Sequence, residues 1–156
     1  MKYFTSLTFL SATYKPFYFY KENYINEIDG IVDCVVYGVE IPNQNDGKAG
    51  MAMLYLEDKY EITPMWLANI YSNLARQLPI YSVPCFLRIS RSKPVVIEHG
   101  EGDKNMTPTF KHKKNALAAD GYESCGTDKL FARVNDKYLP MTEKIIEDTR
   151  SGTIKF

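Results

Sequence analysis

Two apolar stretches in the first third of the chain predict a pair of β-strands. Residues 31–41 are rich in β-branched and aromatic side chains, and Pro42 closes this stretch. Asparagine, aspartate and glycine dominate residues 43–50, as is typical of a turn, and residues 51–56 form the next apolar run. We therefore expect a β-hairpin with a long connecting loop.

The next segment has helical periodicity. Thr63 is a suitable N-cap, Pro64 fits the first turn, and Pro79 ends the pattern. Between these prolines, apolar side chains recur at the spacing of one helix face, at Leu67, Ile70, Tyr71, Leu74 and Leu78. This is the clearest helix that the sequence predicts.

Short strands and further helices occupy the second half of the chain. Helices are expected at about residues 110–119, ended by Gly121, and after Thr142, ended near Gly152. The strands are expected at residues 85–90, 94–98 and 130–134. The mixed order of these elements predicts an α+β fold, a small mixed sheet with a β-hairpin and packed helices.

Composition narrows the classes of function. The 156 residues are enough for one domain with its own core. Lysine plus arginine (19) equals aspartate plus glutamate (19), so no overall field favours nucleic acid or an anionic membrane. The three dispersed cysteines fit neither a disulfide framework nor a zinc site and favour an intracellular setting. No apolar run reaches the ~20 residues of a membrane span, and a signal peptide in residues 1–20 is a less favoured alternative.

Several segments resemble known site motifs but lack the residues that those motifs require. Residues 47–50 (GKAG) lack the leading glycine of a phosphate loop, and Ala49 replaces the hydroxyl residue that would hold magnesium, so a hairpin turn is preferred. His99 and His112 are not spaced as a ligand pair, and no metal site is expected. Cys85 opens an apolar strand, as expected of a buried structural thiol.

Three lysines lie near the start of the helix predicted at residues 110–119. Lys111, Lys113 and Lys114 have the wrong sign for the positive end of the helix dipole. A bound anion would reverse this judgement, because free backbone N–H groups and ammonium groups together form a phosphate site. A solvated basic helix end is the alternative, and Lys111 is the first candidate for an anion-binding residue.

Five segments in order along the chain carry a family resemblance. They are VYGV at residues 36–39, GKAGMA at 47–52, LPIYSVPCFLRI at 78–89, TFKHKK at 109–114 and YLPMT at 138–142. Together they resemble the C-terminal part of fatty acid transport proteins, which are very-long-chain acyl-CoA synthetases of the AMP-forming, adenylate-forming superfamily. The resemblance covers most of the chain, from about residue 32 to residue 156.

The resemblance implies a division of the chain and a role for one lysine. Residues 1–30 would be a divergent N-terminal segment and residues 31–156 the C-terminal domain of an AMP-binding enzyme. In such a ligase, fatty acid and ATP give an acyl adenylate, and CoA then displaces AMP. Lys111 matches the adenylation lysine of the family. We expect the chain to lack the large ATP-binding domain, to bind neither ATP nor CoA alone, and to be inactive alone.

Departures from the family pattern leave alternatives open. Pro108 replaces a family glycine and biases Thr107 toward an extended backbone, and residues 91–106 form a longer loop than usual. Lys21, Glu22 and Asn23 match the family's KGEN segment only faintly. The first alternative function is a non-catalytic regulatory or binding module that docks on an intact synthetase. The second is an anion- or RNA-binding domain, which the neutral net charge disfavours.

Partners and location follow from the same resemblance. The family's substrates, fatty acid, ATP and CoA, would reach this chain through the missing N-terminal domain. No nucleic acid partner is expected. The expected location is intracellular, in a family associated with the endoplasmic reticulum or the plasma membrane. Acyl chain length is not predicted, because the acyl pocket belongs to the other domain.

Overall fold

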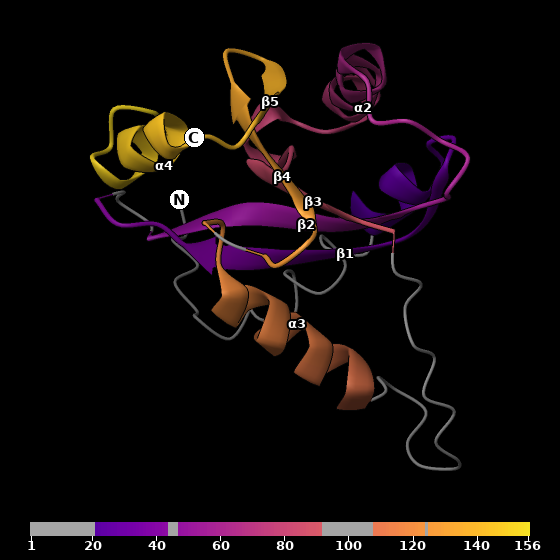
Figure 1. Ribbon diagram of the computed structural model, residues 1–156, viewed down its shortest axis with the longest axis horizontal. Helices are drawn as coiled ribbons and strands as arrows, with labels where there is room; N and C mark the ends of the chain where they lie inside the picture. The colour runs from indigo at the N-terminus through magenta and orange to yellow at the C-terminus, as the bar shows by residue number, and fades with distance from the viewer. Residues whose placement is uncertain (1–20, 44–46, 92–107, 124) are drawn as a thin grey trace, which may run out of the picture.

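The computed structural model describes residues 21–43, 47–91, 108–123 and 125–156, except for the side chains of residues 108–113. The strand predicted at residues 94–98 lies outside this part. One mixed sheet forms the centre of the fold, with helices packed on both of its faces (Figure 1). The α+β prediction is confirmed.

The five strands follow their order in the sequence across the sheet. β1 (Ile31–Glu40) and β2 (Lys48–Leu56) form the predicted antiparallel hairpin. β3 (Phe86–Ser90) runs parallel to β2, and it pairs antiparallel with β4 (Lys129–Val134). The parallel pair is possible because the helical segment between β2 and β3 returns the chain to the same end of the sheet.

The fifth strand was missing from the sequence-based prediction. β5 (Lys137–Pro140) pairs antiparallel with β4 through a two-residue connection. Asn135 and Asp136 both have positive φ, 48° and 61°, which tight hairpins of this length require. A strand of only four residues at the sheet edge, ending in Pro140, has too little pattern to be recognised from its composition.

Alternate residues of the central strands face two separate apolar layers, as the two-residue period of a strand requires. One layer lies under α2 (Pro64–Gln77) and contains Cys34, Val36, Ala52, Leu54, Leu87 and Ile89. The opposite layer contains Val35, Tyr37, Val39, Met51, Met53 and Phe86. Because both faces are covered, residues 34–39 of β1 and 49–56 of β2 form continuous apolar runs instead of alternating with polar residues.

The start of α2 and the face it buries are as predicted. Thr63 is the N-cap, and its Oγ1 accepts a hydrogen bond from the Trp66 backbone N at 3.1 Å. The buried side chains are Leu67, Ile70 and Leu74. Burying a leucine or isoleucine stabilises a fold by roughly 1.5–3 kcal/mol, so this face is a major part of the core.

Residues 21–26 are helical and precede the hairpin, and this helix was not predicted. Ile25 and Ile28 are 0% and 5% exposed and belong to the layer under α2. The chain then turns at Gly30, whose φ is +91° and where an added Cβ would lie 2.6 Å from the Tyr60 ring. Residues 21–30 therefore pack as part of this fold, and the domain boundary placed at residue 30 stays a prediction.

The last two helices lie beyond β3 in the sequence. α3 (Pro108–Asp120) lies on the side of the sheet opposite α2 (Figure 1) and is followed by Gly121 with φ +68°, in agreement with the predicted helix end. α4 (Glu143–Arg150) is capped by Thr142 and followed by Gly152 with φ +76°, also as predicted. Among the described helices, none combines the length and the apolar character needed to cross a membrane.

Candidate functional site

Lys111 lies in the first turns of α3, which begins at Pro108, two residues earlier than expected. Its side chain lies outside the described residues, and the same is true of His112 and Lys113. The backbone position places Lys111 close to the positive end of the helix dipole, where an anion is favoured over a cation. Its assignment as the catalytic lysine stays a prediction.

The C-terminal end of α3 is joined to the centre of the sheet by ion pairs. Arg88 lies on β3, and its Nη1 donates to Asp120 Oδ2 of α3 at 2.7 Å. Its Nε donates to Asp128 Oδ2 at 2.6 Å. The Arg88 side chain is 12% exposed, so these charges are only weakly screened by solvent. Of the α3 side chains that the structure describes, only Leu117 is buried.

Closer to Lys111, a second ion pair joins α3 to the start of the fold. Lys114 Nζ lies 3.0 Å from Glu22 Oε1, and both side chains are largely buried. The same carboxylate oxygen accepts a hydrogen bond from the Val36 backbone N at 2.9 Å. The faint KGEN match around Glu22 and the TFKHKK segment therefore meet in space, although 92 residues separate Glu22 from Lys114.

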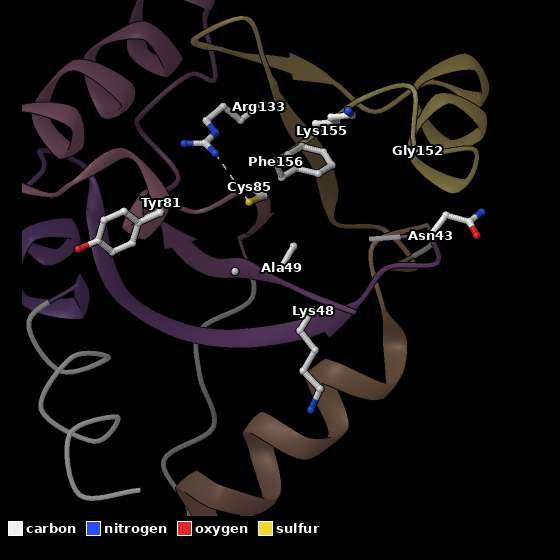
Figure 2. Close-up of a pocket in the computed structure, with 10 residues that line it drawn as sticks. Asn43, Lys48, Ala49, Tyr81, Cys85, Arg133, Gly152, Lys155 and Phe156 are labelled. Carbon is white, nitrogen blue, oxygen red and sulfur yellow. Dashed lines mark hydrogen bonds between the residues drawn. The ribbon is translucent and has the colours of Figure 1, made fainter. Parts of the chain in front are cut away.

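A cationic cavity lies at one end of the sheet, and the sequence did not predict it. Its volume is about 540 Å³. Among the described residues that line it, none carries a carboxylate side chain. Three are cationic, and Figure 2 shows Arg133 and Lys155 above Ala49 in the view, whereas Lys48 extends away from both. The lining residues are Asn43, Lys48, Ala49, Gly50, Tyr81, Cys85, Arg133, Gly152, Lys155 and Phe156.

Arg133 of β4 is held in place by backbone and sulfur acceptors. Its Nη1 donates to the Ile80 carbonyl at 2.8 Å, and its Nη2 donates to Cys85 Sγ at 3.9 Å. A guanidinium has five N–H donors in a planar fork, so these two contacts leave donors for a ligand in the cavity. The fixed fork suits a phosphate or carboxylate group, which it can bind through two hydrogen bonds.

The thiol in this cavity does not offset its positive charge. Burial raises the pKa of Cys85, against the opposing effects of Arg133, of a backbone hydrogen bond at Gly50 and of Lys21. The thiol is therefore neutral at neutral pH, and its burial agrees with the structural role predicted for it. Lys21 is 8% exposed, and burial lowers its pKa, against an opposing charge interaction with Cys85. Sequence reasoning gave Lys21 no role beyond a weak motif match.

The remaining motifs have a structural explanation. Gly47 has φ +63°, while Lys48, Ala49 and Gly50 begin β2, so the GKAG segment is the end of a hairpin loop as predicted. His99 lies outside the described residues. Within the described part of the chain, His, Cys, Asp and Glu side chains do not gather in groups of three or more that could hold a metal ion.

Comparison with known proteins places these features in context. No family model matches the sequence. Long-chain fatty acid transport protein 2 of Rattus norvegicus is 33% identical over 138 residues, covering 84% of this chain and 20% of that protein. A medium/long-chain-fatty-acid–CoA ligase of Mycobacterium tuberculosis is 31% identical over 125 residues, covering 78% of this chain and 18% of that protein. Among solved structures, coronafacic acid ligase from Pectobacterium brasiliense is similar with a TM-score of 0.45 at 18% identity, covering 71% of this chain and 18% of that one.

The chain thus spans about one fifth of the length of the curated relatives it matches. The sequence matches extend over more than three quarters of the chain, and they confirm the resemblance that its five segments indicated. This chain is therefore a homologue of the long-chain fatty acid transport proteins and fatty-acid–CoA ligases, and its sequence and α+β fold fit a C-terminal domain of that superfamily.

Proposed function

We propose that this chain is the lysine-bearing C-terminal domain of a long- or very-long-chain fatty acid–CoA ligase. In this proposal residues 31–156 are that domain, residues 1–30 are a divergent segment, and ATP and fatty acid bind to a separate N-terminal domain. The observation that carries the proposal is the position of Lys111. By the resemblance of its TFKHKK segment, Lys111 would be the family's adenylation lysine, and it lies in the first turns of α3.

A lysine at this position suits the first half-reaction. The fatty acid carboxylate attacks the α-phosphate of ATP, so two anions approach one another while pyrophosphate leaves. An ammonium group placed beside the reacting phosphate stabilises the charge of the transition state. The N-terminal end of α3 favours the same anion through its dipole and its free N–H groups.

The cationic cavity supports contact with the substrate of the second half-reaction. CoA carries several phosphate groups, and it displaces AMP from the acyl adenylate. Arg133 and Lys155 both line the cavity (Figure 2), and none of the described lining residues has a carboxylate side chain to oppose them. A phosphate group of CoA is the anion that this surface would take in the proposed domain.

The decisive experiment places this chain in an intact ligase. The C-terminal domain of a long-chain fatty acid–CoA ligase is replaced by residues 21–156, so that Glu22 and the packed residues 21–30 are included, and acyl-adenylate formation is measured. Lys111→Ala should lower the rate by about 100-fold, the effect of losing one donor to a charged transition state. Lys59→Ala is the matched control, because Lys59 is 70% exposed and pairs only locally with Glu57. A Lys111→Ala rate within twofold of the parent chimera would show that the lysine is wrongly assigned.

A non-catalytic docking module is the second candidate. Ile80 and Tyr81 are 52% and 79% exposed beside the cavity, and exposed apolar side chains of this size favour a protein contact. In this case the chain would form a stable complex with an intact ligase. Co-purification that is lost on Tyr81→Ser, together with an inactive chimera, would support docking over catalysis.

A further inference from the structure

Among the α3 side chains that the structure describes, those of residues 114–120, apolar packing is limited. Leu117 is its buried side chain among those described, with Ala118 partly packed beside it. Both lie in the second half of the helix, near the Arg88–Asp120 ion pair. An isolated helix of 13 residues is marginal in water, so α3 depends on its tertiary contacts.

Ahead of Leu117 in the sequence, Lys114 provides a described contact of α3, with Glu22. Lys114 lies six residues before Asp120, which is roughly 9 Å along the helix axis. Its Nζ is 3.0 Å from Glu22 Oε1, with the two side chains 24% and 14% exposed. Two ion pairs thus hold α3 at separate points, Arg88–Asp120 near its end and Glu22–Lys114 near its middle.

Glu22 is itself fixed to the sheet. β1 is an edge strand, so every second N–H of this strand points away from the sheet. Glu22 Oε1 accepts one of them, from Val36, at 2.9 Å, and the Glu22 carbonyl accepts a hydrogen bond from Cys34 Sγ at 3.4 Å. The carboxylate therefore has a defined position, and it transmits that position to α3.

Lys111 precedes Lys114 by three residues, and positions three apart lie on the same face of a helix. The contact that fixes Lys114 along and around the axis of α3 therefore also fixes the backbone of Lys111. We propose that Glu22 is a positioning residue, which holds the first half of α3 against the β1 edge so that Lys111 is presented from a fixed place. The part of this inference that concerns Lys111 rests on the proposed function.

Amide hydrogen exchange of the full chain tests the contact directly. Glu22→Gln keeps an acceptor for the Val36 N–H but removes the charge. Because the pair is neither fully exposed nor fully buried, we expect amides of residues 112–116 to exchange about tenfold faster, with β2 amides unchanged. Asp33→Asn is the matched control, since Asp33 Oδ1 accepts a hydrogen bond at 2.8 Å from the neighbouring edge N–H, that of Cys34. Unchanged exchange in α3, or an equal increase in β2, would overturn the inference.

The chimeric ligase tests the consequence for catalysis. Glu22→Gln and Lys114→Met should each lower kcat for adenylation by about tenfold with little change in the KM for ATP. Lys114→Arg should retain the rate, and the double variant should be no slower than either single one, because both remove the same contact. If Glu22→Gln has a normal adenylation rate while Lys111→Ala loses activity, the positioning role of Glu22 is refuted and the proposed function stands. If Glu22→Gln speeds amide exchange in α3 but Lys111→Ala leaves the adenylation rate unchanged, the proposed function is refuted and the Glu22–Lys114 contact is supported.

Discussion

Replacing Arg88 by methionine removes the charge that joins β3 to two other parts of the fold. Arg88 donates to Asp120 at the end of α3 and to Asp128 in the turn before β4, at 2.7 Å and 2.6 Å. The side chains of Arg88 and Asp128 are both 12% exposed, whereas Asp120 is 49% exposed. Methionine retains most of the apolar stem, so the change isolates the charge.

The expected cost follows from these exposures. Removing one partner of a buried ion pair costs about 3–5 kcal/mol, because the other charge stays buried and unpaired. An exposed pair contributes up to about 1 kcal/mol. The Asp128 contact belongs to the first class and the Asp120 contact lies closer to the second. We therefore expect Arg88→Met to lower the free energy of unfolding by about 3 kcal/mol, a large part of the roughly 5–15 kcal/mol of a typical domain.

Two further variants separate the charge from other effects. Adding Asp128→Asn to Arg88→Met removes the unpaired carboxylate, so about half of the lost stability should return. Arg150→Met is the matched control. Arg150 pairs with Glu123 at the surface, where the side chains are 55% and 41% exposed, and its loss should cost less than about 1 kcal/mol.

Urea unfolding followed by far-UV circular dichroism measures these differences. The fluorescence of Trp66 is a second probe, because this single tryptophan lies in α2, in the layer opposite α3. Coincident transitions would show that the whole domain unfolds together. The reasoning is refuted if Arg88→Met costs no more than Arg150→Met, or if Asp128→Asn restores nothing.

Three more outcomes are expected. Arg133→Met combined with Lys155→Met should weaken binding of CoA by the chimeric ligase at least tenfold in titration calorimetry, whereas Lys59→Met should not, since Lys59 lies outside the cavity; equal affinities would remove the cavity from the proposed function. Thr63→Ala should cost about 1 kcal/mol of unfolding free energy in urea, because it removes the cap of α2, and Thr63→Ser should retain most of it. Burial, with smaller contributions from Glu22 and Asp33, raises the pKa of the Cys34 thiol in the folded protein. Folding therefore keeps this thiol protonated, and the free energy of unfolding decreases as pH rises above the unfolded thiol pKa of about 8.5. The urea concentration at the unfolding midpoint should therefore decrease as the pH is raised from about 8 to about 10, the range that spans this pKa. Cys34→Ala should make the midpoint less dependent on pH.

Local pattern was sufficient for most of the secondary structure. The hairpin of β1 and β2, the capped start of α2 and the glycine after α3 all came from short-range rules of strand composition, N-capping and left-handed glycine. These rules did not predict the helix at residues 21–26 or strand β5. Strand β5 has only four residues, and both segments are stabilised by contacts with distant residues more than by their own composition.

The two cationic features differ in how far the sequence revealed them. Lys111 stood out because three lysines near a helix start oppose the local dipole, and because TFKHKK matches a family segment. The cavity offered no such signal, since Lys48, Arg133 and Lys155 come from β2, β4 and the last residues of the chain. Only a sheet that places these segments together can create a cluster from single charges.

Sequence alone thus determined the family, the fold class and the candidate lysine, because each depends on residue type and order over short stretches. Tertiary structure decided which charges meet. It paired Glu22 with Lys114 across 92 residues and Arg88 with Asp120 across 32, and it left Arg133 and Lys155 together at a cavity. The physical reason is that an ion pair depends on distance and burial, and both are set by the packing of the sheet between its two layers.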